Sequence, residues 1–276
     1  MDCRRLTATC VCTFVLVSPR MALGQTTPDA SPSLLDEARR ESFIGAAPGE
    51  ARDSRQHMPG FSDLFKPLKG DFQRLLSRDH LGIVQFGTMT AATFAPWDRR
   101  VQATTWNDGR AHDFLKPGAL VGSMAFQSGA AFTTWAIGRA TNKPRIAQLG
   151  ADLVRAQIVS QAVTQAIKLS TQRTRPDGAA LSFPSGHTAS SFATASVLHA
   201  HFGLKAGIPA YAVAAWVAAS RVDMKRHHLS DVIVGATVGL LAGRSVTFGL
   251  NNQRFALAPM AVPGGAGVSI VRINSR

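Results

Sequence analysis

Cysteine is absent from all but the first few residues of this chain. Of 276 residues only three are cysteine, namely Cys3, Cys10 and Cys12. A chain without cysteine after that point has no disulfide, no thiolate nucleophile and no sulfur ligand for a metal. The histidines and carboxylates also lack the spacing typical of a zinc or calcium site, so we expect no bound metal.

The three cysteines lie in a segment that has the parts of a secretion signal. Arg4 and Arg5 give it a basic start, residues 8–17 form a short apolar stretch, and small residues at 22–24 offer a cleavage site. We therefore expect a signal peptide at 1–24 and an exported protein. A protein without cysteine after cleavage suits the bacterial periplasm.

Acidic residues are few compared with basic ones. The chain has 17 aspartate and glutamate residues against 30 lysine and arginine residues, and a formal net charge of +13. Such an excess favours anionic partners. No nucleic-acid-binding module is visible, and the arginines are scattered rather than interleaved with aromatic residues. We expect a phosphate-ester or lipid-phosphate substrate and peripheral contact with an anionic membrane, but no nucleic acid.

Long apolar runs are also lacking. A membrane-spanning helix needs about 20 apolar residues. The stretch 118–138 has no charge but is rich in glycine, serine, threonine and glutamine, 151–170 is interrupted by charges, and 206–220 and 232–243 are short. A soluble helical domain is therefore the favoured expectation, and an integral membrane protein is the alternative.

From Phe61 onward, apolar residues recur at helical spacing. We predict an all-α fold, a helical bundle over 61–250, with a linker or N-terminal extension at 25–60. The tail at 251–276 fits either a β-hairpin or a segment packed on the helices. The periodicity predicts helices over 61–77, 80–95, 113–140, 144–172, 187–203, 207–220 and 229–248.

Three short motifs follow one another in the second half of the chain. They supply three cations, two histidines, a hydroxyl, a glycine amide and a carboxylate. Such a set can hold a phosphate, attack it and protonate its leaving group. The motifs are Lys168-(six residues)-Arg175-Pro176, Pro184-Ser185-Gly186-His187 and Ser220-Arg221-(five residues)-His227-(three residues)-Asp231.

The third motif contains the candidate nucleophile. His227 and Asp231 are four residues apart, so they share one face if both lie on a helix. The Asp231 carboxylate would then accept a hydrogen bond from one ring nitrogen of His227 and leave the other nitrogen unprotonated. His228 is the competing candidate. On a helix it would point about 100° away and would have no carboxylate at the same offset, so His227 is preferred.

The second motif is a turn that leads into a helix. Free backbone N–H groups at a helix start attract anions, and Gly186 lets a phosphate approach the backbone closely. Ser185 adds a hydroxyl donor, and His187 can act as the general acid for the leaving alcohol.

The first motif places two cations seven residues apart. On a helix ending at Pro176, Lys168 and Arg175 would face the same side, toward Arg221. Guanidinium groups bind phosphate oxygens two at a time, and lysine adds a compact charge. We expect the three cations to form one phosphate site.

This ordered set resembles the signature of the type 2 phosphatidic acid phosphatase superfamily, which also contains bacterial acid phosphatases and vanadium haloperoxidases. The resemblance covers about residues 110–250 and implies a helical bundle whose motifs meet at one end and work without a metal. It implies that His227 forms a phosphohistidine, that Asp231 orients it, and that His187 protonates the leaving group and later activates water. The residues that it implies for the phosphate cradle are Lys168, Arg175, Ser185, Gly186 and Arg221.

The chain departs from many lipid-phosphate members beside the third motif. They have a tyrosine-proline step after the catalytic histidine, where this chain has His228-Leu229-Ser230, and residues 222–226 are charged enough to suggest a site open to water. We expect a phosphatase for small esters or lipid phosphates that needs no cofactor. The alternatives are a vanadium-dependent haloperoxidase, with vanadate in the same cradle, and a non-catalytic anionic-lipid-binding protein.

Overall fold

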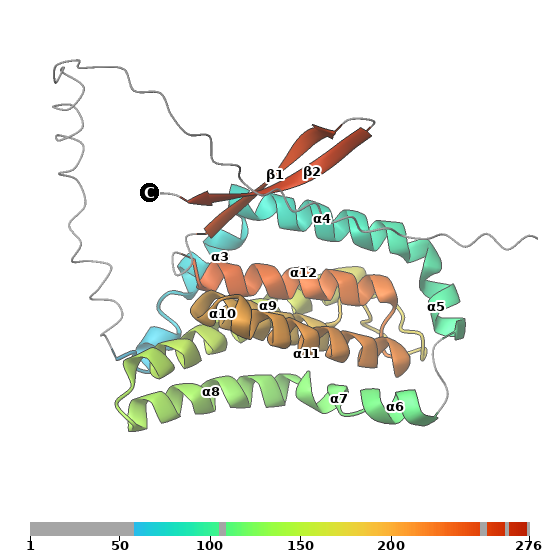
Figure 1. Cartoon of the computed structure of the whole chain (residues 1–276). Helices are drawn as coiled ribbons and strands as arrows, with labels where there is room; N and C mark the ends of the chain where they lie inside the picture. The colour runs from blue at the N-terminus through green and yellow to red at the C-terminus, as the bar shows by residue number, and fades with distance from the viewer. Residues whose placement is uncertain (1–57, 105–108, 249–252, 263–264, 275–276) are drawn as a thin grey trace, which may run out of the picture. The chain divides into compact units, whose positions relative to one another are not determined.

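The computed structural model describes residues 58–104, 109–248, 253–262 and 265–274 (Figure 1). The expected signal peptide at 1–24 and nearly all of the expected linker at 25–60 lie outside these residues.

A series of helices is followed by two strands. The prediction of a helical bundle is confirmed. The two strands of the tail pair antiparallel, with Gln253 opposite Asn274 and Val262 opposite Gly265. In chain order the elements are η1 (Ser62–Leu64), α3 (Leu68–Leu75), α4 (Arg78–Phe94), η2 (Ala95–Trp97), α5 (Asp98–Thr104), α6 (Gly109–Leu115), α7 (Gly118–Val121), α8 (Met124–Ala140), α9 (Pro144–Thr171), α10 (Gly186–Phe202), α11 (Leu204–Asp223), α12 (Leu229–Val246), β1 (Gln253–Val262) and β2 (Gly265–Asn274).

Three helices, α9, α10 and α12, pack against one another at the centre of the bundle (Figure 1). α8 packs on α9, α11 on α10 and α4 on α12. α12 approaches α10 closely because glycine recurs every fourth residue on the facing side. A Cβ at Gly235 would lie 2.6 Å from the carbonyl oxygen of Ser185, and one at Gly239 would lie 2.3 Å from that of Ala189. These glycines therefore set α12 directly against the turn of the second motif.

The predicted helix over 113–140 is wrong, because the structure has three helices there, α6, α7 and α8. Pro117, which has no N–H to donate, separates α6 from α7. Ser123 starts α8 as its N-cap and accepts the N–H of Phe126 at 3.2 Å. The predicted helix over 61–77 is likewise divided into η1 and α3.

The helix α12 runs through the core. Of the described helices it alone is long and apolar enough, by length and composition, to cross a membrane. Of this stretch, Leu229–Val246, 67% is buried inside the structure. The core around it consists mainly of alanine and valine, since the most buried apolar side chains include Ala156, Val159, Ala193, Val197, Val217 and Ala242.

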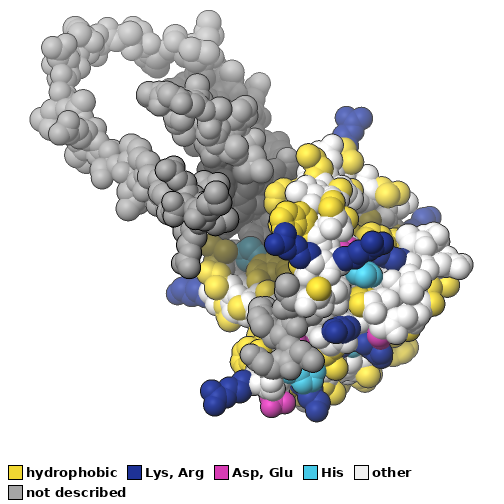
Figure 2. Space-filling model, turned by 90° about the vertical axis from the view of Figure 1, so that its right-hand side faces the viewer, with side chains coloured by type: hydrophobic (Ala, Val, Ile, Leu, Met, Phe, Trp, Pro, Cys, Tyr) yellow, Lys and Arg dark blue, Asp and Glu magenta, His cyan; other side chains and the backbone are white. Residues whose placement is uncertain are grey.

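The helix α4 exposes large apolar side chains. Phe86 and Met89 are 73% and 70% exposed, and Leu81 and Phe94 also face outward. On the face of the molecule seen in Figure 2, apolar side chains lie among lysine and arginine side chains. Exposed apolar groups of this size commonly mark a surface that meets a protein or a membrane.

Candidate active site

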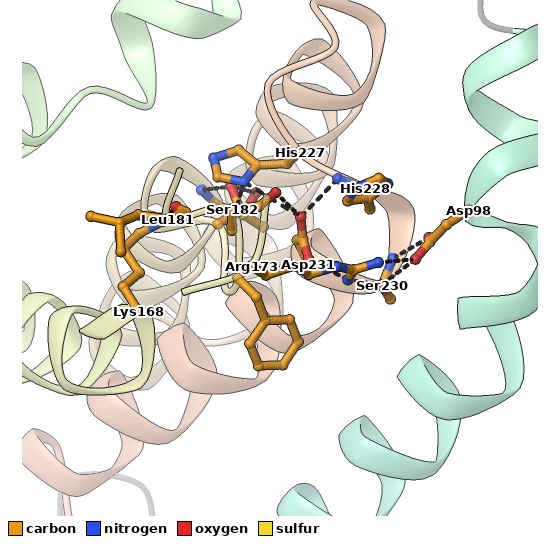
Figure 3. Close-up of polar contacts among 12 residues, drawn as sticks. Asp98, Lys168, Arg173, Leu181, Ser182, His227, His228, Ser230 and Asp231 are labelled. Atoms are coloured by element: carbon orange, nitrogen blue, oxygen red, sulfur yellow. Dashed lines mark hydrogen bonds and ion pairs between the residues drawn. The ribbon is translucent and has the colours of Figure 1, made fainter. Parts of the chain in front are cut away.

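Segments from all three motifs are tied together by hydrogen bonds at one end of α9 and the first turns of α10 and α12. Figure 3 shows the part of this site around Ser182, His227 and Asp231. The backbone N–H of Ser185 donates to the carbonyl oxygen of Asp231 at 3.0 Å. The N–H of His227 donates to the carbonyl oxygen of Arg221 at 3.2 Å. The structure thus brings the sequence-predicted residues into one site.

The candidate nucleophile His227 precedes α12, which begins at Leu229. Its Nδ1 lies 2.7 Å from the carbonyl oxygen of Ser182 and 3.7 Å from Oδ2 of Asp231. Since a carbonyl oxygen only accepts hydrogen bonds, Nδ1 is the donor, and the neutral ring keeps its lone pair on Nε2. The expected hydrogen bond from His227 to Asp231 is therefore replaced by one to Ser182, with Asp231 close enough for an electrostatic interaction.

Asp231 makes contacts beyond the predicted one with His227, because the helix starts after His227 rather than before it. As the third residue of α12, Asp231 accepts the backbone N–H of His228 through Oδ2 at 2.8 Å, as a capping residue does. Oδ2 also accepts the hydroxyl of Ser182 at 2.5 Å, and Oδ1 accepts Nη1 of Arg173 at 2.7 Å. Burial alone would raise the pKa of Asp231, but the interaction with His227, the hydrogen bonds from Ser182 and the His228 N–H, and the Arg173 charge lower it below its ordinary value. The carboxylate stays ionised and fixed in orientation.

The environment of His227 keeps its ring neutral. The residue is 3% exposed. Burial lowers the pKa of His227, and the positive charge of Lys168 adds to this, although Asp231 opposes it. An unprotonated Nε2 is therefore available over the neutral pH range.

Lys168 reaches the site from the last turns of α9. Its Nζ donates to the carbonyl oxygen of Leu181 at 2.5 Å. Burial, followed by the charge of Arg175, lowers the pKa of Lys168 to about 8. Leu181 has a φ of +62°, which is uncommon for a residue with a side chain, and this conformation belongs to the turn that also presents the Ser182 carbonyl.

The other two cations of the cradle are Arg175 and Arg221. Within the described ranges, the buried Nε atom of each makes no hydrogen bond. Within the same ranges, Lys168, Arg175 and Arg221 form no ion pair with a carboxylate. Burial, and then the charges of Arg226 and Arg175, lower the pKa of Arg221 to about 10. Buried guanidinium donors without partners are costly unless an anion satisfies them, so this arrangement fits an oxyanion.

The turn before α10 presents further donors. Ser185 is the N-cap of α10, and its Oγ accepts the N–H of Thr188 at 3.4 Å and the Thr188 hydroxyl at 2.9 Å. Both contacts use Ser185 as the acceptor, so its own hydroxyl hydrogen can be donated to a ligand. At Gly186 a Cβ would lie 3.6 Å from Cγ2 of Thr164, an ordinary contact, so the protein itself leaves room for a side chain there.

His187 lies in the first turn of α10, where neighbouring positive charges affect its pKa. Burial, followed by the charges of Arg221, His227, Arg175 and Lys168, lowers the pKa of His187 to about 4. The ring is neutral while the site is empty. A bound phosphate dianion would offset the cations and favour the protonated ring that a general acid requires.

Three residues that the motif reasoning did not single out also belong to the site. Ser182 holds both His227 and Asp231, and Arg173 joins Asp231 to Asp98 through two ion pairs (Figure 3). Arg173 lies inside the first motif, where a third basic residue was the available signal. No signal in the sequence pointed to Asp98, because it lies 133 positions before Asp231, in a short helix that the periodicity did not predict.

The side chains of His199, His201 and His228 have partners outside the cradle. Nε2 of His228 lies 3.3 Å from the carbonyl oxygen of Thr174, and Nε2 of His201 lies 2.8 Å from Oδ2 of Asp152. The ring of His199 packs edge-on against Tyr211. In the part of the chain that the structure describes, no group of three or more histidine, cysteine, aspartate or glutamate side chains is placed to hold a metal ion.

Comparison with known sequences finds a protein family that matches the segment with the second and third motifs. The sequence model of the PAP2 superfamily matches residues 177–255, which include His187, His227 and Asp231. The segment 177–255 belongs to the PAP2 superfamily. The resemblance seen in the three motifs is thereby confirmed.

One curated relative is the lipid A 1-phosphatase of Porphyromonas gingivalis. It is 46% identical over 80 residues, which are 28% of this chain and 18% of the relative. The chain therefore matches less than a fifth of that protein.

Two solved structures are similar to this one. Aquifex aeolicus LpxE matches with a TM-score of 0.46 and 21% identity over 55% of this chain and 93% of its own. The transmembrane PAP2 type phosphatidylglycerolphosphate phosphatase of Bacillus subtilis matches with a TM-score of 0.45 and 18% identity over 62% of this chain and 94% of its own.

Proposed function

We propose that this PAP2 protein is a metal-independent phosphatase that hydrolyses phosphate monoesters through a phosphohistidine at His227. The observation that carries the proposal is the combination of three cations that have no carboxylate partner among the described residues and a histidine whose Nδ1 is committed to the Ser182 carbonyl. The cations can hold a phosphate, and Nε2 of His227 is left as the nucleophile.

In the first half-reaction, the cradle binds the phosphoryl oxygens and Nε2 of His227 attacks phosphorus. The N–P bond forms as the P–O ester bond breaks, and His187 donates its proton to the departing oxygen. The His227 ring keeps its Nδ1 proton and so becomes positively charged. The Ser182 carbonyl and the Asp231 carboxylate lie on the side of the ring where that charge is stabilised.

In the second half-reaction, the neutral His187 takes a proton from water, and the resulting nucleophile attacks phosphorus. The N–P bond breaks, and His227 returns to its neutral form with the proton still on Nδ1. The same cations stabilise the oxyanion charge in both steps.

The substrate class that we propose is a lipid phosphate presented at a membrane surface. The similarity to a lipid A 1-phosphatase supports this, as does the net charge of +13, which attracts anionic headgroups. The exposed apolar side chains of α4 are followed by Trp97 of η2, which is 51% exposed and immediately precedes Asp98 of the site. Contact of α4 with a bilayer would therefore bring the site next to its substrate. We propose an exported, periplasmic protein held at the membrane in this way.

The decisive experiment is phosphate release by the mature chain in the presence of EDTA. Two substrates are compared, p-nitrophenyl phosphate without detergent and phosphatidic acid in mixed micelles. We expect His227→Ala to abolish release from both, while His228→Ala, the matched neighbour, retains it. Full activity in His227→Ala would refute the mechanism.

The same assay separates the competing functions. Faster turnover of phosphatidic acid than of p-nitrophenyl phosphate supports the lipid substrate, and the reverse order supports a small ester. Halide oxidation by the vanadate-loaded protein would indicate a haloperoxidase. Binding to anionic vesicles without turnover of either substrate would indicate a lipid-binding protein.

A further inference from the structure

Behind the Asp231 carboxylate lies a second ionic layer formed by Arg173 and Asp98 (Figure 3). Nη1 of Arg173 donates to Oδ1 of Asp231 at 2.7 Å, and Nη2 donates to Oδ2 of Asp98 at 2.8 Å. One guanidinium therefore bridges two carboxylates that come from α5 and α12. Neither Arg173 nor Asp98 is part of the proposed phosphate cradle.

Asp98 also completes the start of α12. It is 3% exposed and is the first residue of α5. Its Oδ1 accepts the backbone N–H of Ser230 at 3.0 Å, and its Oδ2 accepts the Ser230 hydroxyl at 2.6 Å. The first N–H groups of a helix have no partner within it, so a carboxylate from another helix stabilises this end. Asp231 is the next residue, so Asp98 fixes the backbone from which the Asp231 side chain projects.

The charges alternate outward from the reacting ring. The His227 ring, which becomes positive during phosphoryl transfer, is followed by the negative Asp231, the positive Arg173 and the negative Asp98. Arg173 alone would offset the negative charge that Asp231 presents to His227. Asp98, on the other side of the guanidinium, counteracts this effect, because opposite charges at hydrogen-bond distance attract each other. The Arg173 side chain is 34% exposed, so water screens part of this attraction.

We propose that Asp98 and Arg173 are positioning residues for the phosphoryl-transfer step. Arg173 holds the Asp231 carboxylate toward the Nδ1–H side of His227, and Asp98 keeps that carboxylate effective by balancing Arg173. As the N–P bond forms and the P–O bond breaks, the ring retains its Nδ1 proton, and the layer stabilises its positive charge. This inference rests on the proposed phosphohistidine mechanism and adds the residues that act through Asp231.

The kinetic test uses the mature chain and the variants Asp98→Asn, Arg173→Gln and the double variant. Asp98→Asn leaves Arg173 unbalanced, so we expect kcat for p-nitrophenyl phosphate to fall about 10- to 100-fold while KM stays within about twofold. In the double variant both charges are gone, so its loss should be smaller than the product of the two single losses. An unchanged kcat in Asp98→Asn, or strictly multiplicative losses, would overturn the proposal.

A second measurement does not depend on turnover. NMR titration of the His227 ring should show a lower pKa in Asp98→Asn, because Arg173 then has no Asp98 carboxylate to offset its positive charge. In Arg173→Gln that positive charge is removed, so the pKa of His227 should be higher. The other titratable groups that face His227 are Lys168 from α9, His187 from α10 and Asp231 from α12, and all are retained in these variants.

The opposite signs of these shifts distinguish electrostatic positioning from simple loss of packing, which would move both variants in the same direction. The control is Asp79→Asn, which removes an exposed carboxylate from the far end of α4 and should leave the His227 pKa unchanged. Shifts of the same sign, or none in either variant, would refute the inference. An inactive wild type with shifts of opposite sign would instead refute the proposed function and leave the ionic layer in place.

Discussion

The carbonyl oxygen of Ser182 lies 2.7 Å from Nδ1 of His227, closer than any atom of Asp231, whose Oδ2 is 3.7 Å away. The acceptor that fixes the tautomer of the ring is therefore a backbone group. No side-chain substitution removes it directly. Asp231 contributes charge near the ring and holds the Ser182 hydroxyl at 2.5 Å, so the two residues share the task of orienting His227.

Asp231→Asn should therefore reduce kcat without abolishing it, because the Ser182 carbonyl still holds the proton on Nδ1. Ser182→Ala keeps the carbonyl and should lower kcat less than Asp231→Asn does. Its loss of a buried hydrogen bond to a carboxylate should lower the free energy of unfolding by about 1.5–3 kcal/mol. Steady-state kinetics and urea unfolding at pH 7 measure both effects. Activity in Asp231→Asn as low as in His227→Ala would show that the carbonyl does not maintain the tautomer.

The sequence predicted the members of the site better than their contacts. Motif spacing was enough to group Lys168, His187 and His227, because the residue types themselves describe the chemistry. The predicted hydrogen bond from His227 to Asp231 becomes an electrostatic contact of 3.7 Å, because it required both residues to lie on one helix. The capping of α12 at His228 places His227 in the preceding turn.

The missed contacts share a physical cause. The Ser182 acceptor is a backbone carbonyl, which every residue has, so no residue type signals it. Asp98 lies in a seven-residue helix that is too short to show periodicity, and its partners are more than 70 positions away. In the predicted helix over 113–140, the apolar pattern continues through Pro117 and Gly122, but the helical backbone is interrupted near both residues.

Gly186 offers a test of the phosphate cradle that leaves the fold intact. A Cβ at this position would make only ordinary contacts with the protein, the nearest at 3.6 Å, so Gly186→Ala should change the thermal unfolding temperature little. If a phosphate lies against the backbone there, KM should rise and inhibition by inorganic phosphate should weaken.

The matched control is Gly235→Ala on α12. Its Cβ would lie 2.6 Å from the carbonyl oxygen of Ser185, so this variant should unfold at a lower temperature. Equal phosphate affinity in wild type and Gly186→Ala would mean that the anion does not approach this amide.

Arg221 should stabilise the complex with phosphate but destabilise the empty protein. It is 6% exposed, lies near other cations and makes no ion pair among the described residues. Arg221→Met, which keeps much of the side-chain volume, should raise the free energy of unfolding by about 1–2 kcal/mol and remove the stabilisation by added phosphate. Thermal unfolding with and without phosphate measures both.

The comparison variant is Arg226→Met. Arg226 pairs with Asp177 at 2.8 Å, and its side chain is 48% exposed. Such a pair contributes less than about 1 kcal/mol, so this variant should keep its response to phosphate. A lower stability of Arg221→Met in the absence of phosphate would contradict the account of Arg221 as an unsatisfied cation.

Binding of a dianion should draw a proton onto His187. In the empty site the pKa of His187 is lowered to about 4, so at pH 6 the ring is neutral. A bound dianion offsets the neighbouring cations and raises this pKa, so the complex binds more protons than the free protein. Affinity should therefore fall as the pH rises from about 4 to the His187 pKa of the complex.

Sulfate is the suitable probe for this proton uptake, because it stays doubly charged across the range. Calorimetric titration at pH 6 in two buffers of different ionisation enthalpy gives the number of protons taken up. We expect a positive number for the wild type and none for His187→Gln, which keeps a polar side chain but does not titrate. Proton uptake that persists in His187→Gln would assign the titrating group elsewhere. Lys168, whose pKa is about 8, is already protonated at pH 6 and takes up no proton there. The loss of proton uptake in His187→Gln at pH 6 thus decides whether His187 is charged by its substrate, as the proposed general acid must be.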